Sequence, residues 1–227
     1  MFTGFPEDIQ EFFATIQNNN RRDWFLENKS WYEDSVQNPA LELVRSIEKP
    51  LKKVSPHFTA VAKKSGGSIM RIYRDTRFSK NKSPYKTNLG IHFKHEMGKD
   101  VHAPGFYFHV SAHSIFIGAG IWHPESKTLN QIRALIDDDA ARFKRSRNSK
   151  KFKSKFEIGG DSLKRPPRGY EKDHPMIEDL KRKDHIAIAS LDEKQIYRAD
   201  LIDVLIEHFK AAKPFVRFLC DSIYLPC

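Results

Sequence analysis

The chain has 227 residues, of which 39% are hydrophobic and 12% aromatic, and its formal net charge at pH 7 is +10. This length and composition suffice for one sizeable hydrophobic core. No apolar run reaches the roughly 18 to 20 residues needed to span a bilayer. The first six residues, Met1 to Pro6, lack the basic and apolar regions of a signal peptide. We therefore expect a cytoplasmic protein with no membrane partner.

Positive charge is concentrated in the middle of the chain. Residues 61–172 hold 24 basic and 10 acidic residues, a net charge of +14. Residues 1–60 (7 basic, 9 acidic) and 173–227 (8 basic, 10 acidic) are each at −2. Because a basic surface attracts and steers anions, the admissible partners are nucleic acid, nucleotides, phosphorylated metabolites and acidic proteins.

Residues 1–55 have the patterns of helices. Apolar side chains recur at helical spacing from Ile9 to Ile16. Asn20 is placed to cap the next helix, and Pro39 to open a third one that Pro50 should bend or end. We expect three helices before the first strand.

Short segments rich in β-branched and aromatic residues follow. The expected strands are residues 57–62, 68–74, 89–94, 105–110 and 114–121. The last two are close enough in sequence to form a hairpin, so at least part of the sheet should be antiparallel.

Helix is expected again over residues 126–145, where a basic stretch at 142–155 begins that contains no acidic residue. A loop then precedes a short helix from His174 to about Lys183. A strand at 185–189 and a final helix over 199–222, interrupted or kinked at Pro214, complete the chain.

These elements predict an α+β fold in a single domain, residues 1–227, because helices gather at both ends of the chain and strands in the middle. The central, mostly antiparallel sheet should span about residues 57–121, with one further strand near 185–189. The expected sections are helical 1–55, sheet and basic motif 57–121, helix and basic stretch 126–156, and loop, strand and C-terminal helix 166–227.

The most distinctive segment is residues 71–86, Arg-Ile-Tyr-Arg-Asp-Thr-Arg-Phe-Ser-Lys-Asn-Lys-Ser-Pro-Tyr-Lys. Guanidinium groups hold phosphate or carboxylate through paired hydrogen bonds, and lysines add adaptable charge. Aromatic side chains interleaved with cations also occur on surfaces that stack nucleic-acid bases. We predict that this segment is the centre of a site for a phosphorylated or other anionic ligand, with a solvated basic hairpin as the alternative.

The candidate ligand-binding residues are Arg71, Tyr73, Arg74, Arg77, Lys82, Tyr85, Lys86 and Tyr107. Asp75 and His109 are the candidate catalytic residues for proton transfer, and the cations beside Asp75 should favour its ionised form. Alternation along the strand places Tyr107 and His109 on the face opposite Phe106 and Phe108. There they would form part of a binding floor.

Six histidines fall between residues 92 and 123, without a His-Glu-x-x-His helix or a carboxylate at suitable spacing. We therefore predict no metal site, and the identity of any cofactor stays unknown. Gly118 and Gly120 either ease a strand bend or let a phosphate approach the backbone. Cys220 and Cys227 do not make a disulfide framework.

The run from Arg71 to Lys80, followed by Lys82 to Thr87, resembles the signature of the uncharacterised family known as domain of unknown function 2461. Supporting matches are Asn19–Phe25, Phe106–Val110 with Gly118–Gly120, Leu129 with Ile132-Arg133, and Pro167–Tyr170 before His174-Pro175. The resemblance covers nearly the whole chain and implies a single-domain member of that family. It implies no reaction, cofactor or catalytic residue.

Three functions stay open. A small-ligand site, with an enzymatic role left open, requires the candidate side chains to converge in one concave pocket. A nucleic-acid-binding module would use residues 71–86 and 142–155 as one basic stripe, and its affinity would fall steeply with salt. A protein-interaction module would instead present exposed aromatic residues.

Overall fold

The computed structural model describes residues 2–98 and 103–227 and confirms an α+β fold. Within these residues, five antiparallel strands form one sheet in the order β1-β2-β3-β5-β4. The strands are β1 Asn88–Lys94, β2 Gly105–Ser111, β3 Ile115–Ile121, β4 Glu157–Gly159 and β5 His185–Ser190. The predicted hairpin is confirmed as β2 and β3, and the predicted strand near 185–189 as β5.

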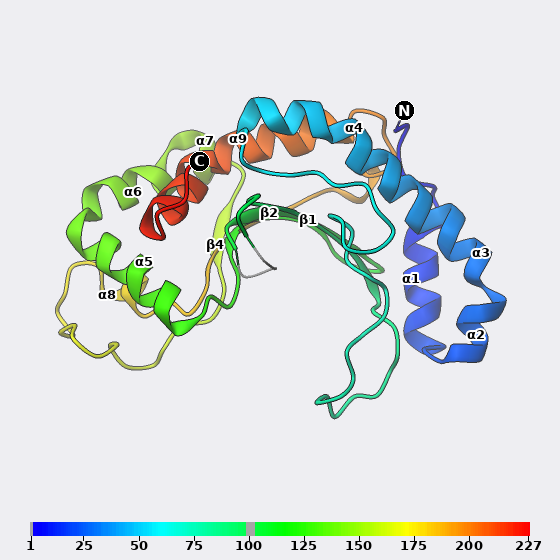
Figure 1. Ribbon diagram of the computed structural model, residues 1–227, viewed down its shortest axis with the longest axis horizontal. Coiled ribbons are helices and arrows are strands. Elements are labelled where there is room, and N and C mark those ends of the chain that lie inside the picture. The colour runs from blue at the N-terminus through cyan, green and yellow to red at the C-terminus, as the bar shows by residue number, and fades with distance from the viewer. Residues whose placement is uncertain (1, 99–102) are drawn as a thin grey trace.

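Helices lie at both ends of the sheet and over one of its faces (Figure 1). The first group is α1 Ile9–Asn18, α2 Arg22–Glu27, α3 Lys29–Tyr32, the π-helix η1 Glu33–Gln37 and α4 Asn38–Val54. The second is α5 Ser126–Asp138, α6 Ala140–Asn148, α7 Lys150–Lys153, α8 Ile177–Leu180, the 3-10 helix η2 Glu193–Gln195 and α9 Leu201–Ser222. Helices α4 and α9 cover the convex face of the arched sheet.

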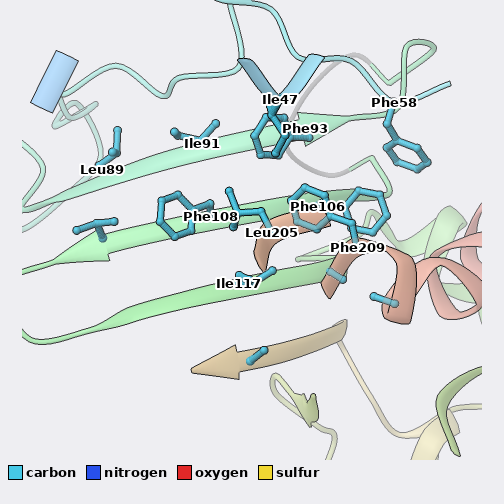
Figure 2. Packing of buried hydrophobic residues seen from close by; sticks show 14 of the residues in the cluster. Ile47, Phe58, Leu89, Ile91, Phe93, Phe106, Phe108, Ile117, Leu205 and Phe209 are labelled. Carbon is cyan, nitrogen blue, oxygen red and sulfur yellow. The ribbon is translucent and has the colours of Figure 1, made fainter. Parts of the chain in front are cut away.

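A large part of the core lies between the sheet and these two helices. Successive strand residues point to opposite faces, and the alternate side chains of β1 to β3 that face the helices are buried. Figure 2 shows Phe106 and Phe108 beside Leu205 of α9, and Phe106 stacks on Phe209 with 4.5 Å between ring centroids. Burying each such side chain contributes about 1.5–3 kcal/mol. This packing fixes which face of each strand turns away from the helices.

The predicted first helix is confirmed, with Ile9 and Ile16 both buried. Pro50 was expected to bend or end the third helix. It does not end the helix, because α4 continues to Val54. Proline removes one backbone hydrogen bond. The side chains of Leu51 and Val54 beyond it are buried in the core, and that burial offsets the loss.

The predicted strands at 57–62 and 68–74 are not regular strands. They run beside β1 and pair only at single positions, such as Phe58 with His95 and Ile69 with Ile91. Part of the hydrogen bonding that a strand would use goes elsewhere: the Val61 amide donates to the hydroxyl of Ser68 (2.9 Å). A polar side chain at the turn thus competes with the ladder.

The helix expected over 126–145 is two helices. Asp139 separates α5 from α6, and its carboxylate accepts a hydrogen bond from the Arg142 amide (3.0 Å), which caps α6. The short strand β4 was not predicted, and α9 is continuous through Pro214. No helix in the described part of the chain is long and apolar enough to cross a membrane.

Candidate functional site

A pocket of about 520 Å³ lies on the sheet face that turns away from α4 and α9. We call it the sheet-face pocket. It is lined by Met70, Lys86, Asn88, His92, Gly105, Tyr107, Phe116, Gly118, Ala119, Gly120, Trp122, Ile186 and Ile188. Aromatic and aliphatic groups dominate this lining, and Lys86 is the one lysine or arginine in it.

Glycines hollow the floor of this pocket. Tyr107 of β2 pairs with Gly118 of β3, which pairs in turn with Ile188 of β5. In the next row, Gly105 pairs with Gly120. Side chains are therefore missing from the middle of the face while its edges carry large ones. At Gly120 the backbone also requires glycine, since φ is +123° and a Cβ would lie 2.0 Å from a carbonyl oxygen.

A second, polar pocket of about 320 Å³ adjoins the first and shares Lys86 and Asn88 with it. It is lined by Gln17, Asn20, Arg74, Asn81, Ser83, Tyr85, Lys86, Thr87 and Asn88. Because two residues border both pockets, we describe the two pockets together as one trough. Its floor is apolar at the sheet, and its end is rich in amides and hydroxyls.

Residues 71–86 form a basic arm that extends from the sheet away from α4 and α9 (Figure 1). Its two sides are joined by the bond from the Lys86 amide to the carbonyl of Ile72 (2.7 Å) and by the pairing of Tyr73 with Tyr85. The predicted role of Asn20 as a helix cap is wrong. Its side-chain amide instead donates to the carbonyl of Tyr85 and accepts from the Tyr85 amide, both at 3.0 Å, and so fastens the arm to the N-terminal helices.

Lys86 stands at the junction of the two pockets. Its side chain is half-buried, and its ammonium forms no hydrogen bond or ion pair with any residue that the structure describes. Burial lowers the pKa of Lys86, and the nearby cation Arg71 lowers it further. An ammonium in this position is a ready partner for an anion.

Tyr107, His109 and Asn88 form a hydrogen-bonded group on the pocket side of β1 and β2. The Tyr107 hydroxyl lies 3.2 Å from Nδ1 of His109, whose ring stacks on Phe116 with 4.4 Å between centroids. Burial raises the pKa of Tyr107 to about 12 and lowers that of His109 to about 4. The imidazole is therefore neutral at pH 7, and its Nδ1 faces both the Tyr107 hydroxyl and the Asn88 side-chain amide, which lies 3.5 Å away.

The trough brings together some of the predicted residues. Lys86 and Tyr107 line the sheet-face pocket, with His109 bonded behind Tyr107, and Arg74 lines the polar pocket. Arg71 is exposed, close enough to Lys86 to perturb it. These residues come from the arm and from β2, which are distant in sequence.

The aromatic residues of the arm have two different roles. Tyr85 is buried and stacks on Phe25 of α2 with 4.2 Å between centroids, so it chiefly anchors the arm. Tyr73 is 57% exposed and packs beside Tyr85 with its ring centroid 5.5 Å away. Tyr73 lines neither of the two pockets.

The tip of the arm holds the remaining predicted residues outside both pockets. Both oxygens of Asp75 accept from Arg77, with the closest contact at 2.7 Å. These hydrogen bonds lower the pKa of Asp75 to about 2, which makes it a weak base. Lys82 donates to the carbonyl of Thr76 (2.9 Å), and Phe78 is 95% exposed.

Trp122, His92 and Asn88 line the sheet-face pocket and were not candidates from sequence. Trp122 directly follows β3 and stacks on His123 with 4.2 Å between ring centroids. The buried carboxylate of Asp184 accepts from both the amide and Nδ1 of His123, each at 2.7 Å, and so fixes this corner. Of these three, His92 could have been found from strand alternation, which places its side chain on the sheet face that also carries Tyr107.

The clustered histidines of the sequence go to separate places. His95 is buried, accepts from the Met97 amide at Nδ1 (3.1 Å) and lies 2.6 Å from the carbonyl of Pro226 at Nε2. His102 lies outside the described residues. Across residues 2–98 and 103–227, no group of three His, Cys, Asp or Glu side chains gathers as a metal ion would need.

The segment Pro167–Tyr170 and His174 lie near α5 and α8, at the other end of the sheet from the arm (Figure 1). Arg133 of α5 is buried there and donates to the carbonyl of Leu180 (2.7 Å), while His174 pairs with Asp137 (3.0 Å). These contacts hold the α5–α8 end together.

The chain is similar to one described family of proteins. No curated protein and no solved structure matches the chain. A family model described as a conserved hypothetical protein, DUF2461, matches residues 8–218, a span that includes the basic arm, all five strands and most of α9. Since the match covers nearly the whole chain, the protein belongs to the DUF2461 family.

Proposed function

We propose that the protein binds a small anionic ligand with an aromatic or apolar body in the trough. The body rests on the glycine floor between Tyr107 and Trp122, and the anionic group lies against Lys86. Concave, mostly apolar sites with a few polar groups that fix orientation are the usual form of small-molecule sites.

The position of Lys86 carries this proposal. A half-buried ammonium without a protein partner has lost part of its hydration and gained no hydrogen bond in return. The charge that lowers the pKa of Lys86 beyond the effect of burial belongs to another cation, Arg71. A phosphate, sulfonate or carboxylate at this junction would neutralise both groups and form charge-assisted hydrogen bonds worth about 1.5–3 kcal/mol each.

The polar pocket supports a ligand with a second polar part. Arg74 offers a guanidinium there, and Asn81 and Ser83 offer amide and hydroxyl groups. A phosphate-bearing or hydroxyl-rich extension would therefore find donors beyond Lys86.

The test uses 8-anilinonaphthalene-1-sulfonate, which combines an aromatic body with one anionic group. Lys86→Met keeps the length of the side chain and removes its charge, and Lys82→Met makes the same change at the exposed tip of the arm. We expect Lys86→Met to weaken binding about 10- to 100-fold, the equivalent of one charge-assisted hydrogen bond. Lys82→Met should bind like the wild type. Equal affinities for all three proteins would refute the proposal.

A second candidate function is single-stranded nucleic-acid binding by the basic arm. Phe78 is 95% exposed, Tyr73 is 57% exposed, and the guanidinium of Arg77 lies 5.8 Å from the Phe78 ring. Exposed aromatic rings among cations suit base stacking with backbone neutralisation. The basic block at 142–155 lies at the other end of the sheet in Figure 1, so it does not extend this surface. An oligonucleotide titration at low salt tests it: affinity should fall steeply with salt and with Phe78→Ala, and no binding would exclude it.

A further inference from the structure

Lys86 and Lys82, two of the three lysines of the basic arm, differ in burial and in hydrogen bonding, both of which control the reactivity of an amine. Its amine borders an apolar pocket and has no hydrogen-bond or ion-pair partner among the described residues. Lys82 is exposed, and its ammonium donates to the carbonyl of Thr76 (2.9 Å). Only the neutral amine is a nucleophile, and an apolar wall with a second cation nearby favours that form.

The rest of the pocket suits attack on a carbonyl carbon. Tyr107 and Asn88 share the wall with Lys86 and present a hydroxyl and an amide. Both can hydrogen-bond a carbonyl oxygen. Arg71 and Arg74 add two guanidinium groups near Lys86, so an anionic substituent has cationic partners besides the Lys86 amine.

We propose that Lys86 forms a reversible imine with an aromatic or apolar carbonyl compound that also carries an anionic group. This inference rests on the proposed function, since it uses the same trough. The Lys86 nitrogen attacks the carbonyl carbon, and the carbonyl oxygen takes up a proton to give a carbinolamine. The hydroxyl so formed then leaves with the second proton of the amine as water. One amine and one carbonyl thus give one imine and one water, and no oxidant or reductant is consumed.

The probe for this reaction is 4-formylbenzoate, an aromatic aldehyde with a carboxylate. Incubation with sodium cyanoborohydride reduces any imine to a stable secondary amine, and peptide mapping by mass spectrometry locates it. At limiting aldehyde we expect Lys86 to take the label before Lys82 does. Benzaldehyde lacks the anion, so it should need about tenfold more reagent for the same labelling of Lys86.

Three comparisons separate a specific amine from general lysine chemistry. Lys86→Arg retains the positive charge and should lose the label at this position while the labelling of Lys82 is unchanged. Terephthalate, which has no aldehyde, should protect Lys86 alone. Labelling of Lys86 should also begin at a lower pH than labelling of Lys82, because the pKa of Lys86 is lowered by its burial and by Arg71.

Label spread evenly over exposed lysines, or Lys86 labelled no faster than Lys82, would overturn the imine proposal. Binding of 8-anilinonaphthalene-1-sulfonate, measured on the same sample, tells this failure from a failure of the trough itself. If the dye still depends on Lys86, the ligand site stands and only the imine is refuted. If neither the dye nor the aldehyde responds to Lys86, both are refuted.

Discussion

Filling the floor of the sheet-face pocket should abolish most ligand binding without harming the fold. Gly118 lies in the middle of that floor, opposite Tyr107, and its backbone is outside the left-handed region. A Cβ there would lie 3.4 Å from the Cβ of Tyr107, an ordinary contact. Gly118→Leu therefore projects its side chain into the pocket of about 520 Å³.

The expected magnitudes for Gly118→Leu follow from two separate effects. Replacing a strand glycine whose backbone suits other residues removes freedom from the unfolded chain, which stabilises a protein by about 0.4–1 kcal/mol. Forcing a ligand to share space with an added side chain costs about 1–3 kcal/mol. That penalty corresponds to an affinity roughly 5- to 150-fold weaker.

The assay is fluorescence titration with 8-anilinonaphthalene-1-sulfonate, with thermal unfolding and near-ultraviolet circular dichroism on the same samples. Gly118→Ala is the matched control, because its single methyl group contacts Tyr107 and leaves most of the pocket open. It should bind close to the wild type. A folded Gly118→Leu protein with wild-type affinity would refute the assignment of the pocket as the ligand site.

Three further predictions concern the groups around the trough. Asp75→Asn should leave the affinity for the dye unchanged, because Arg77 binds the carboxylate of Asp75 at the arm tip. A loss of affinity would show that Asp75 belongs to the ligand site. His109, with its pKa lowered by burial from 6.5 to about 4, binds fewer protons folded than unfolded, so it makes stability fall as the pH drops from 6.5 towards 4. His109→Phe should flatten that dependence in denaturant titrations, and nuclear magnetic resonance should show a neutral His109 ring at pH 6, whereas an imidazolium would contradict this. For Asp184, burial opposes ionisation, but hydrogen bonds from Asp161 and His123 lower the pKa overall, so its contribution is present above pH 3.8 and is lost below it. Asp184→Asn should cost about 1–3 kcal/mol of unfolding free energy at pH 7 and remove this acid dependence, and an unchanged denaturation midpoint would contradict the role of Asp184.

The first and last helices and the strands β1, β2, β3 and β5 were predictable because their periodicity is set by burial. Ile9 to Ile16 and Phe106 to Val110 show the spacings of three to four and of two that a helix and a one-sided strand require. Segments 57–62 and 68–74 have the composition of strands but not their pairing. Ser68 takes a backbone bond there, and such competition between a side chain and the ladder cannot be seen in composition.

The candidate site was only partly predictable. Charge and alternation indicated Lys86, Tyr107 and His109, because these signals are local. The same charge signal also included Asp75 and Arg77, which bond to one another outside the pockets. Whether a charged side chain turns inward or outward depends on how the arm is fastened. That depends on Asn20, located 65 residues before the Tyr85 backbone that it binds.

The lack of side chains in the middle of the pocket floor was the feature that the sequence indicated least clearly. Gly118 and Gly120 have several possible meanings in a strand, among them a bend, a bulge or a close approach. Which of these roles the two glycines have depends on the sheet face that they share with Tyr107 and on the side chains of the neighbouring strand β5. Only the register between β2, β3 and β5 gives that information.

The most direct test of the ligand site is a crystal structure of the protein with 8-anilinonaphthalene-1-sulfonate bound. The trough predicts naphthalene rings over Gly118 and Gly120, with the sulfonate within hydrogen-bond distance of the Lys86 ammonium. Dye bound only at the arm tip beside Phe78, or on the helices, with the sheet-face pocket empty, would contradict the central claim.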